Sequence, residues 1–226
     1  MVNANTAILE DEATAISAKI AEIKTHSQAE VVCALATESG RYDRAESIVG
    51  IGCALLALLI GNSLLSSSAT ADGDWQEYVS LSLGMQLLLT GLGFALGTIL
   101  ASYVLPLRRL VARSQEMTRE VDRAAAFVFA QQHMQSTQSA SGLLIYVSLY
   151  ERQIRLIADE QVLTCLPDGG LDGLMELALP HLRSGATPAA FAAILDALAE
   201  PLAEALPAVD AENELENHLL RFHPRP

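Results

Sequence analysis

Apolar residues change their spacing several times along the chain, and each change marks a different predicted element. Residues 6–25 repeat apolar side chains at helical spacing, which predicts an amphipathic helix. In "AEVVCALATES", residues 29–39, both alternating sets are apolar, which is typical of a central strand covered by helices on each face. The stretch "GLLIYVSLYERQIRLIADEQV", residues 142–162, reads as a strand, a polar turn and a second strand.

Helical spacing returns after each of these strands. Residues 107–135 predict one long helix, residues 171–183 and 187–205 predict two more, and the tail from Pro207 predicts a short amphipathic helix. We expect the strand at residues 29–39 to pair with the later hairpin, because an isolated hairpin is marginal in water. The element order predicts an α/β fold, a three-layer sandwich on a small mixed sheet.

Two uncharged segments interrupt this pattern. Residues 47–66 carry no charge over 20 positions, and residues 79–105 carry none over 27. About 20 apolar residues suffice to cross a hydrocarbon core roughly 30 Å thick. We therefore predict a two-helix transmembrane hairpin, residues 46–106, inserted into one discontinuous α/β domain of residues 1–45 and 107–226. Two buried helices of a soluble core are the alternative.

The charges around these segments predict their orientation. The loop at residues 67–78 is acidic and lacks Lys and Arg, whereas arginines flank the outer ends of both spans at Arg41, Arg44, Arg108, Arg109 and Arg113. Loops rich in Lys and Arg stay in the cytoplasm. Both termini and the α/β domain are therefore expected in the cytoplasm, at the inner membrane, with the short loop outside.

Small residues within the spans predict how the two helices pack. Gly93 and Gly97 form a GxxxG spacing, which permits close backbone approach. We expect them to pack one span against the other, and a homodimer face is the alternative. Both spans lack ionisable residues, which argues against a proton relay or an ion pathway.

Composition narrows the possible functions. The formal net charge of −13 argues against nucleic-acid binding, because phosphate neutralisation needs a basic face. The three cysteines lie far apart, without a CxxC pair or a Cys/His cluster, so neither a zinc site nor a disulfide framework is expected. The first residues are polar and acidic, unlike a cleavable signal peptide.

Charge is also divided unevenly along the second half of the chain. Residues 107–158 carry seven arginines and four acids, whereas residues 159–226 carry three arginines and twelve acids. The basic part follows the second span directly. It is suited either to anionic lipid headgroups or simply to a solvated surface.

Three stretches give the chain a family resemblance: "AEVVCALA" after the first helix, "SGLLIYVSLYERQIRLIADEQV", and the closing "ALPAVDAENEL". Together they resemble the TPM domain family, including a membrane-anchored subgroup with a transmembrane hairpin inside the domain. The resemblance implies an α/β sandwich on a four-stranded sheet. It also implies links to membrane-complex assembly, acid phosphatase activity or binding of calcium and other divalent metals among relatives.

Residue by residue, the resemblance places Glu30 at an acidic position of the family. The family also carries arginines just before the second strand. This chain has "HMQSTQSASG" there, with Gln and Ser in their place, so an anion-binding role of those arginines is not carried over.

Carboxylates near strand ends are the candidates for chemistry. Asp159 ends the second hairpin strand, and Asp168 and Asp172 lie in the following Gly-rich turn. With Glu30 they offer hard oxygen ligands for Ca²⁺ or Mg²⁺. Turn formation alone also explains Asp168, because the spacing does not match an EF-hand loop.

No catalytic residue is identified from the sequence. Ser148 lies inside a strand without the GxSxG elbow of a hydrolase, and the histidines have no evident partners. We therefore expect a non-enzymatic interaction or assembly factor for membrane-associated proteins, without a certain cofactor. A Ca²⁺- or Mg²⁺-dependent phosphatase is the alternative.

Overall fold

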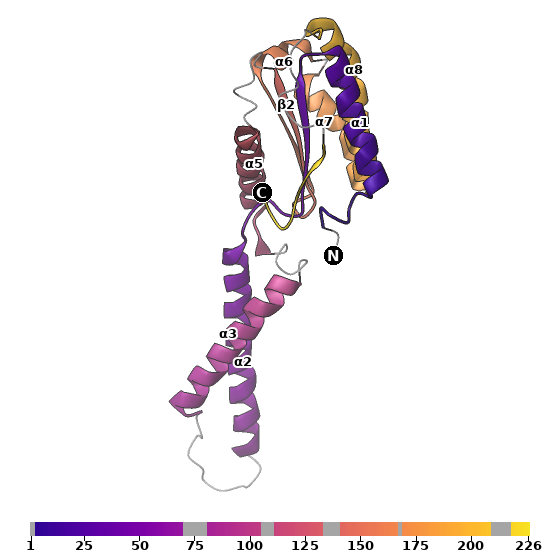
Figure 1. Ribbon diagram of the computed structural model, residues 1–226. Helices are drawn as coiled ribbons and strands as arrows, with labels where there is room; N and C mark the ends of the chain where they lie inside the picture. Colours follow the sequence, from indigo (N-terminus) through magenta and orange to yellow (C-terminus); the bar gives the residue numbers. More distant parts are fainter. Residues whose placement is uncertain (1–2, 70–80, 105–110, 133–140, 167–168, 209–217) are drawn as a thin grey trace. The chain divides into compact units, whose positions relative to one another are not determined.

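The computed structural model describes residues 3–69, 81–104, 111–132, 141–166, 169–208 and 218–226. Its helices and strands follow in the order α1 (Glu10–His26), β1 (Glu30–Ala36), α2 (Asp43–Ala69), α3 (Leu83–Tyr103), α5 (Ser114–Gln131), β2 (Gly142–Ser148), β3 (Gln153–Ala158), α6 (Glu160–Cys165), α7 (Gly170–Arg183), α8 (Thr187–Ala205) and β4 (Leu220–Phe222) (Figure 1).

The chain divides into two compact units. Residues 41–116 form one unit, which holds α2 and α3. Residues 1–40 and 117–226 together form the other, which holds the sheet and is called the α/β unit below. The chain thus leaves the α/β unit after β1 and returns to it in α5.

A four-stranded mixed sheet lies at the centre of the α/β unit, in the order β3-β2-β1-β4 (Figure 1). β1 is parallel to β2 and β4, while β2 and β3 are antiparallel. The register sets Glu30 opposite Gly142 and Ala36 opposite Ser148. The predicted pairing of the first strand with the later hairpin is therefore confirmed.

Helices cover both faces of the sheet, as the two-sided apolar pattern of β1 predicts. Val31, Cys33 and Leu35 belong to a core cluster shared with α1, α7 and α8. Val32 and Ala34 point to the opposite face, into a second cluster shared with α5. The layers are thus α5, the sheet, and α1 with α7 and α8, which confirms the predicted α/β class (Figure 1).

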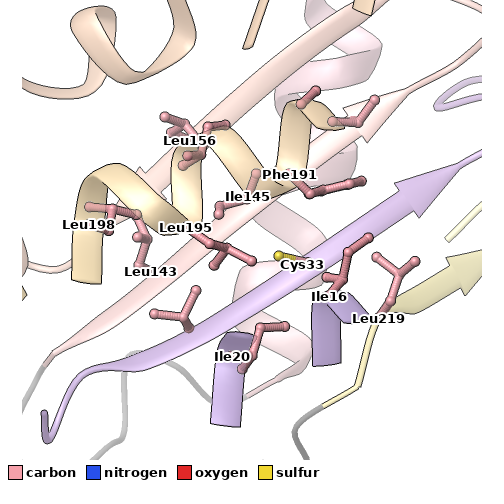
Figure 2. Packing of buried hydrophobic residues seen from close by; sticks show 14 of the residues in the cluster. Ile16, Ile20, Cys33, Leu143, Ile145, Leu156, Phe191, Leu195, Leu198 and Leu219 are labelled. Carbon is pink, nitrogen blue, oxygen red and sulfur yellow. The ribbon is translucent and has the colours of Figure 1, made fainter. Parts of the chain in front are cut away.

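The larger core cluster surrounds the thiol of Cys33. Figure 2 shows Cys33 of β1 among Ile16 and Ile20 of α1 and Phe191 and Leu195 of α8. All five side chains are almost completely buried. Burial raises the pKa of the Cys33 thiol, because a thiolate would lose its hydration there. Cys33 is therefore a core side chain that stays protonated, not a nucleophile.

The second hairpin strand ends at Ala158, next to the predicted end at Asp159, and α6 begins at Glu160. One local prediction is wrong. The tail predicted to be helical forms β4 at Leu220–Phe222, while residues 209–217 lie outside the described part. β4 is a strand because it pairs with β1, a tertiary contact that local helical spacing cannot reveal.

The helices α2 and α3 are both long and apolar enough to cross a membrane. They correspond to the predicted spans 47–66 and 79–105. Gly93 and Gly97 of α3 are buried, and a side chain at Gly93 would come within 2.9 Å of the Ala54 backbone in α2. The glycines therefore face α2 of the same chain, as expected for packing within the hairpin, and a homodimer face stays untested.

Gly97→Cys tests which of these two packings exists in solution. A Cβ atom at this position would lie 2.7 Å from Cβ of the native Cys53, about 1 Å closer than in a typical disulfide. A small separation of the helices accommodates the bond. We expect a hydrophobic oxidant to form an intrachain disulfide in the full-length protein within lipid, detected by electrophoresis without reductant.

Gly91→Cys is the matched control, since a side chain there meets nothing within 4 Å. It should stay reduced under the same conditions. A covalent dimer formed by Gly97→Cys, in place of the intrachain bond, would instead assign these glycines to a homodimer.

Candidate functional site

Polar side chains gather at both ends of the parallel strands β1 and β2. The amino ends hold Glu30 and Asp159, which the sequence analysis predicted as metal ligands. The carboxyl ends hold Ser39, Ser148 and Glu151, which it did not. Ligands in α/β folds commonly bind at the carboxyl ends of parallel strands.

At the amino end, the two predicted ligands lie on either side of Gly142. Glu30 is the register partner of Gly142, and its carboxylate forms an ion pair with Lys24 of α1. Asp159 Oδ2 accepts a hydrogen bond from the Gly142 N–H at 3.0 Å, and the Asp159 N–H donates to the Gly142 carbonyl at 2.9 Å. Each carboxylate therefore already has a partner that holds the end of the sheet together.

The other two predicted ligands lie elsewhere. Asp168 is outside the described residues. Asp172 is exposed in the first turn of α7, where a carboxylate interacts favourably with the helix dipole. Throughout the described part of the chain, no three His, Cys, Asp or Glu side chains converge as a metal site. The structure thus brings Glu30 and Asp159 to one end of the sheet, and the metal site stays a prediction.

The carboxyl end holds a buried polar network that we call the Glu151 cluster: Ser39, Tyr146, Ser148 and Glu151. The Glu151 carboxylate accepts hydrogen bonds from the Ser39 backbone N–H at 2.9 Å and from the Ser148 hydroxyl. Ser39 Oγ and the Tyr146 hydroxyl lie 2.9 Å apart. Glu151 is only 3% exposed, so its charge is stabilised by these donors in place of water.

Strand register explains how this cluster assembles. Because Ala36 pairs with Ser148, the residues that follow β1 lie against the turn that follows β2. The Leu149 N–H donates to the Ala36 carbonyl at 3.0 Å, and the Tyr150 N–H donates to the Thr37 carbonyl at 2.9 Å. The turn then closes through Arg152, whose φ of 54° is in the left-handed region.

The protonation state of Tyr146 indicates the role of its hydroxyl in this network. Burial raises the pKa of the Tyr146 phenol; the hydrogen bond with Ser39 opposes this effect, and the Glu151 carboxylate adds to it. Tyr146 therefore stays a neutral hydroxyl that bonds to Ser39. The Ser148 hydroxyl is buried and committed to Glu151. These contacts join two loops, and the three hydroxyl-bearing residues of the cluster are all buried.

The carboxyl terminus of the chain is tied to the same end of the sheet. The Thr37 N–H donates to the Phe222 carbonyl at 3.1 Å, and the Glu38 N–H donates to the Pro224 carbonyl at 3.0 Å. Arg225 Nε donates to Glu38 Oε1 at 2.9 Å. The loop after β1 is thus held between the turn after β2 and the segment after β4.

Sequence reasoning missed the Glu151 cluster for an identifiable reason. Ser148 is the one serine in a strand otherwise rich in apolar residues, and Glu151 follows three positions later. A polar side chain at the end of a buried strand, with an acid within the next turn, is a usable local signal. Ser39 lies more than one hundred residues away, so its part in the network needs the strand register.

Comparison with known proteins agrees with this architecture. Residues 103–200 match the model of the TPM domain. The solution structure of the BA42 protein from the psychrophilic bacterium Bizionia argentinensis is similar, with a TM-score of 0.55, 14% sequence identity and 95% of each chain covered. At this identity the likeness shows the fold alone. No curated protein matches the sequence.

The TPM match covers α5, β2, β3, α6, α7 and most of α8, the part that follows the uncharged segments. β1 precedes the match but pairs with β2 to complete the same sheet. The resemblance to the TPM domain predicted from the sequence is thereby confirmed over residues 103–200.

Proposed function

We propose that this protein, whose residues 103–200 match the TPM domain, is a membrane-anchored, non-enzymatic interaction or assembly factor of the inner membrane. Its α/β unit would act in the cytoplasm on membrane-associated proteins. The observation that carries this proposal is the outer surface of α2 and α3, where large apolar side chains are left uncovered. Leu59 in α2 is 69% exposed, and Leu96 in α3 is 65% exposed.

These two belong to a larger set of exposed apolar side chains on the same helices. The exposed large apolar side chains of the two helices include Ile48, Ile51, Leu55, Leu56, Leu59, Ile60 and Leu64 in α2, and Leu83, Leu87, Leu88, Leu92, Phe94, Leu96, Ile99 and Leu100 in α3. Monomeric soluble proteins rarely expose apolar patches larger than a few hundred Å². A lipid bilayer removes this cost, since its hydrocarbon core is as apolar as leucine.

The polar groups of the α/β unit support a role without catalysis. Glu30 is bound to Lys24, Asp159 to Gly142, and Glu151 to Ser39 and Ser148. Each of these carboxylates holds two segments of the fold together. A catalytic site would place a nucleophile beside a base, with room for a reacting atom close to both.

A metal titration with a phosphatase assay tests the non-enzymatic reading. We expect no turnover of a generic phosphomonoester by the full chain in detergent, and no Ca²⁺- or Mg²⁺-dependent rise in its melting temperature. Asp159→Asn and the exposed-site control Glu176→Gln are measured in parallel. Metal-dependent turnover that Asp159→Asn removes and Glu176→Gln keeps would establish the phosphatase instead.

Photo-crosslinking tests the proposed interaction. Leu9, Leu163 and Leu177 are large apolar residues of the α/β unit, with 68%, 48% and 48% of their surface exposed. A photoreactive residue at each position, in native membranes, is expected to give a discrete adduct with a membrane-associated protein from at least one of them. Diffuse labelling from all three would contradict a specific partner.

A reporter fused at Gly73, in the loop between the predicted spans, tests the orientation. We expect activity from a reporter that functions only outside the cytoplasm, because the loop lacks Lys and Arg. The matched fusion after Pro226 should report the cytoplasm. A cytoplasmic signal from the Gly73 fusion would overturn the proposed topology.

A further inference from the structure

The helix α5 has two contrasting faces. One face packs against the sheet through Met117, Val121, Ala124, Ala125, Val128 and Phe129, all buried. On the other face, Arg119, Arg123 and Phe127 follow one another at a spacing of four residues. Side chains four apart lie above one another on a helix, so these three residues form a single outward stripe, called the α5 stripe below.

The three side chains of the α5 stripe make few contacts within the protein. Arg123 is 75% exposed, and its ion-pair partner among the described residues is Glu120 of the same helix, 3.1 Å away. Arg119 is exposed and has no ion-pair partner in the described part of the chain. Phe127 is 53% exposed. The two guanidinium groups and the phenyl ring of the stripe therefore contribute little to the stability of the α/β unit.

The acids on the same helix neutralise the stripe only in part. Glu120 pairs with Arg123, whereas the Asp122 carboxylate forms an ion pair with Arg155 of β3 and so does not pair with Arg119. Residues 104–123 contain five arginines and three acids, in a chain whose overall formal charge is −13. A local basic surface on an acidic protein points to an anionic partner.

The position of the stripe in the chain identifies that partner. Residues 104–113 join α3 to α5 and carry Arg108, Arg109 and Arg113. With α3 as the proposed span, ten connecting residues limit how far the start of α5 can lie from the bilayer, so a contact of α5 with lipid would be effectively intramolecular. Basic segments beside a span bind anionic headgroups, and an aromatic ring prefers the headgroup–acyl boundary.

We propose that the α5 stripe lies against the anionic lipid surface, with Arg119 and Arg123 at lipid phosphates and Phe127 at the acyl boundary. This inference rests on the proposed membrane anchor. It assigns α5 two contacts, one to the sheet and one to the bilayer. The orientation of the α/β unit at the membrane would then be defined by headgroup recognition as well as by the connecting chain.

Tryptophan fluorescence in vesicles tests this contact with the full chain. In a Trp75→Phe background, which removes the single native tryptophan, Phe127→Trp places a reporter in the stripe. The vesicles contain phosphatidylcholine alone or an equal mixture with phosphatidylglycerol, with and without brominated acyl chains. We expect blue-shifted emission and strong quenching by brominated lipid in the mixed vesicles, and weak quenching in phosphatidylcholine alone.

Two variants sharpen the result. Adding Arg119→Gln and Arg123→Gln should weaken docking in the mixed vesicles about 30-fold, because each substitution removes the attraction of one arginine to a lipid phosphate. Leu177→Trp is the matched control, because Leu177 is 48% exposed on α7 in the acidic part of the chain. Its emission should stay unquenched in both kinds of vesicle.

The outcomes separate this inference from the anchor. A chain that floats with the vesicles, with position 127 as unquenched as position 177, overturns the docking and leaves the anchor standing. A chain that does not float overturns both. Equal quenching in both lipids overturns the recognition of anionic headgroups. Blue-shifted emission without quenching by brominated lipid indicates burial against a second protein and also overturns the proposal.

Discussion

Replacing both Leu56 and Leu92 with arginine is expected to remove most of the chain from the membrane fraction. Both residues lie near the middle of their spans, and they are 57% and 53% exposed. An arginine at the centre of a transmembrane helix costs about 2.5–3.5 kcal/mol on the insertion scale, so the pair costs about 5–7 kcal/mol. The measurement is the distribution of the full chain between membrane and soluble fractions.

The double substitution distinguishes membrane spans from helices of a water-soluble protein, because it has opposite expected effects in the two cases. If α2 and α3 were helices of a water-soluble protein, charges at exposed leucines would improve solubility and change stability little. Leu163→Arg is the matched control, because Leu163 is 48% exposed on α6 of the α/β unit. It should change stability by no more than about 0.5 kcal/mol and leave the membrane fraction unchanged. A doubly substituted chain that stays in the membrane would contradict the account.

Glu151→Ala is expected to destabilise the α/β unit by about 2–6 kcal/mol. The change leaves the Ser39 N–H and the Ser148 hydroxyl without their acceptor, and each unsatisfied buried donor costs about 1–3 kcal/mol. A loss of this size is comparable with the whole stability of a small domain. Denaturant unfolding of the full chain in detergent, followed by the near-ultraviolet signal of the α/β unit, measures it.

Glu176→Ala is the matched control for this prediction. Glu176 is exposed on α7, so its removal should change stability by no more than about 0.5 kcal/mol. A functional carboxylate can often be removed at little cost to stability, or with a gain. If the Glu151→Ala protein were as stable as the Glu176→Ala protein, a structural role of the Glu151 cluster would be contradicted. The carboxyl end of the sheet would then again be a candidate functional site.

The elements that could be predicted are those whose apolar residues recur at the spacing of a strand or a helix. Residues 29–39 carry two apolar faces, and the structure places helices on both sides of β1. The last helix, predicted at residues 187–205, has those bounds in α8. Periodicity works here because burial on each face is the main determinant of these elements.

The parts that could not be predicted depend on contacts distant in sequence. β4 has three residues, and it is a strand because β1 offers it an edge at Ala34–Ala36. The candidate site shows the same limit. Asp159, a predicted metal ligand, lies between β3 and α6, and its hydrogen bond with Gly142 depends on the pairing of β2 with β3. Ser39 and Glu151 meet through the parallel register of β1 and β2.

The polar network lies where the chain leaves the sheet and continues toward α2. The chain leaves β1 through Thr37, Glu38 and Ser39 and enters α2 at Asp43. The hydrogen bonds at Thr37 and Glu38 reach the segment after β4, and the one at Ser39 reaches Glu151. The exit from the sheet is therefore fixed on both sides. We infer that the Glu151 cluster keeps the sheet intact where the apolar hairpin interrupts it.

Alkaline carbonate extraction of membranes that contain the unmodified full chain tests the central claim most directly. Carbonate at high pH releases peripheral proteins and leaves integral proteins in the bilayer. With α2 and α3 as membrane spans, the chain should stay in the pellet with a known integral protein, and detergent should release both. Recovery of the chain in the carbonate supernatant would contradict the membrane anchor on which the proposed function rests.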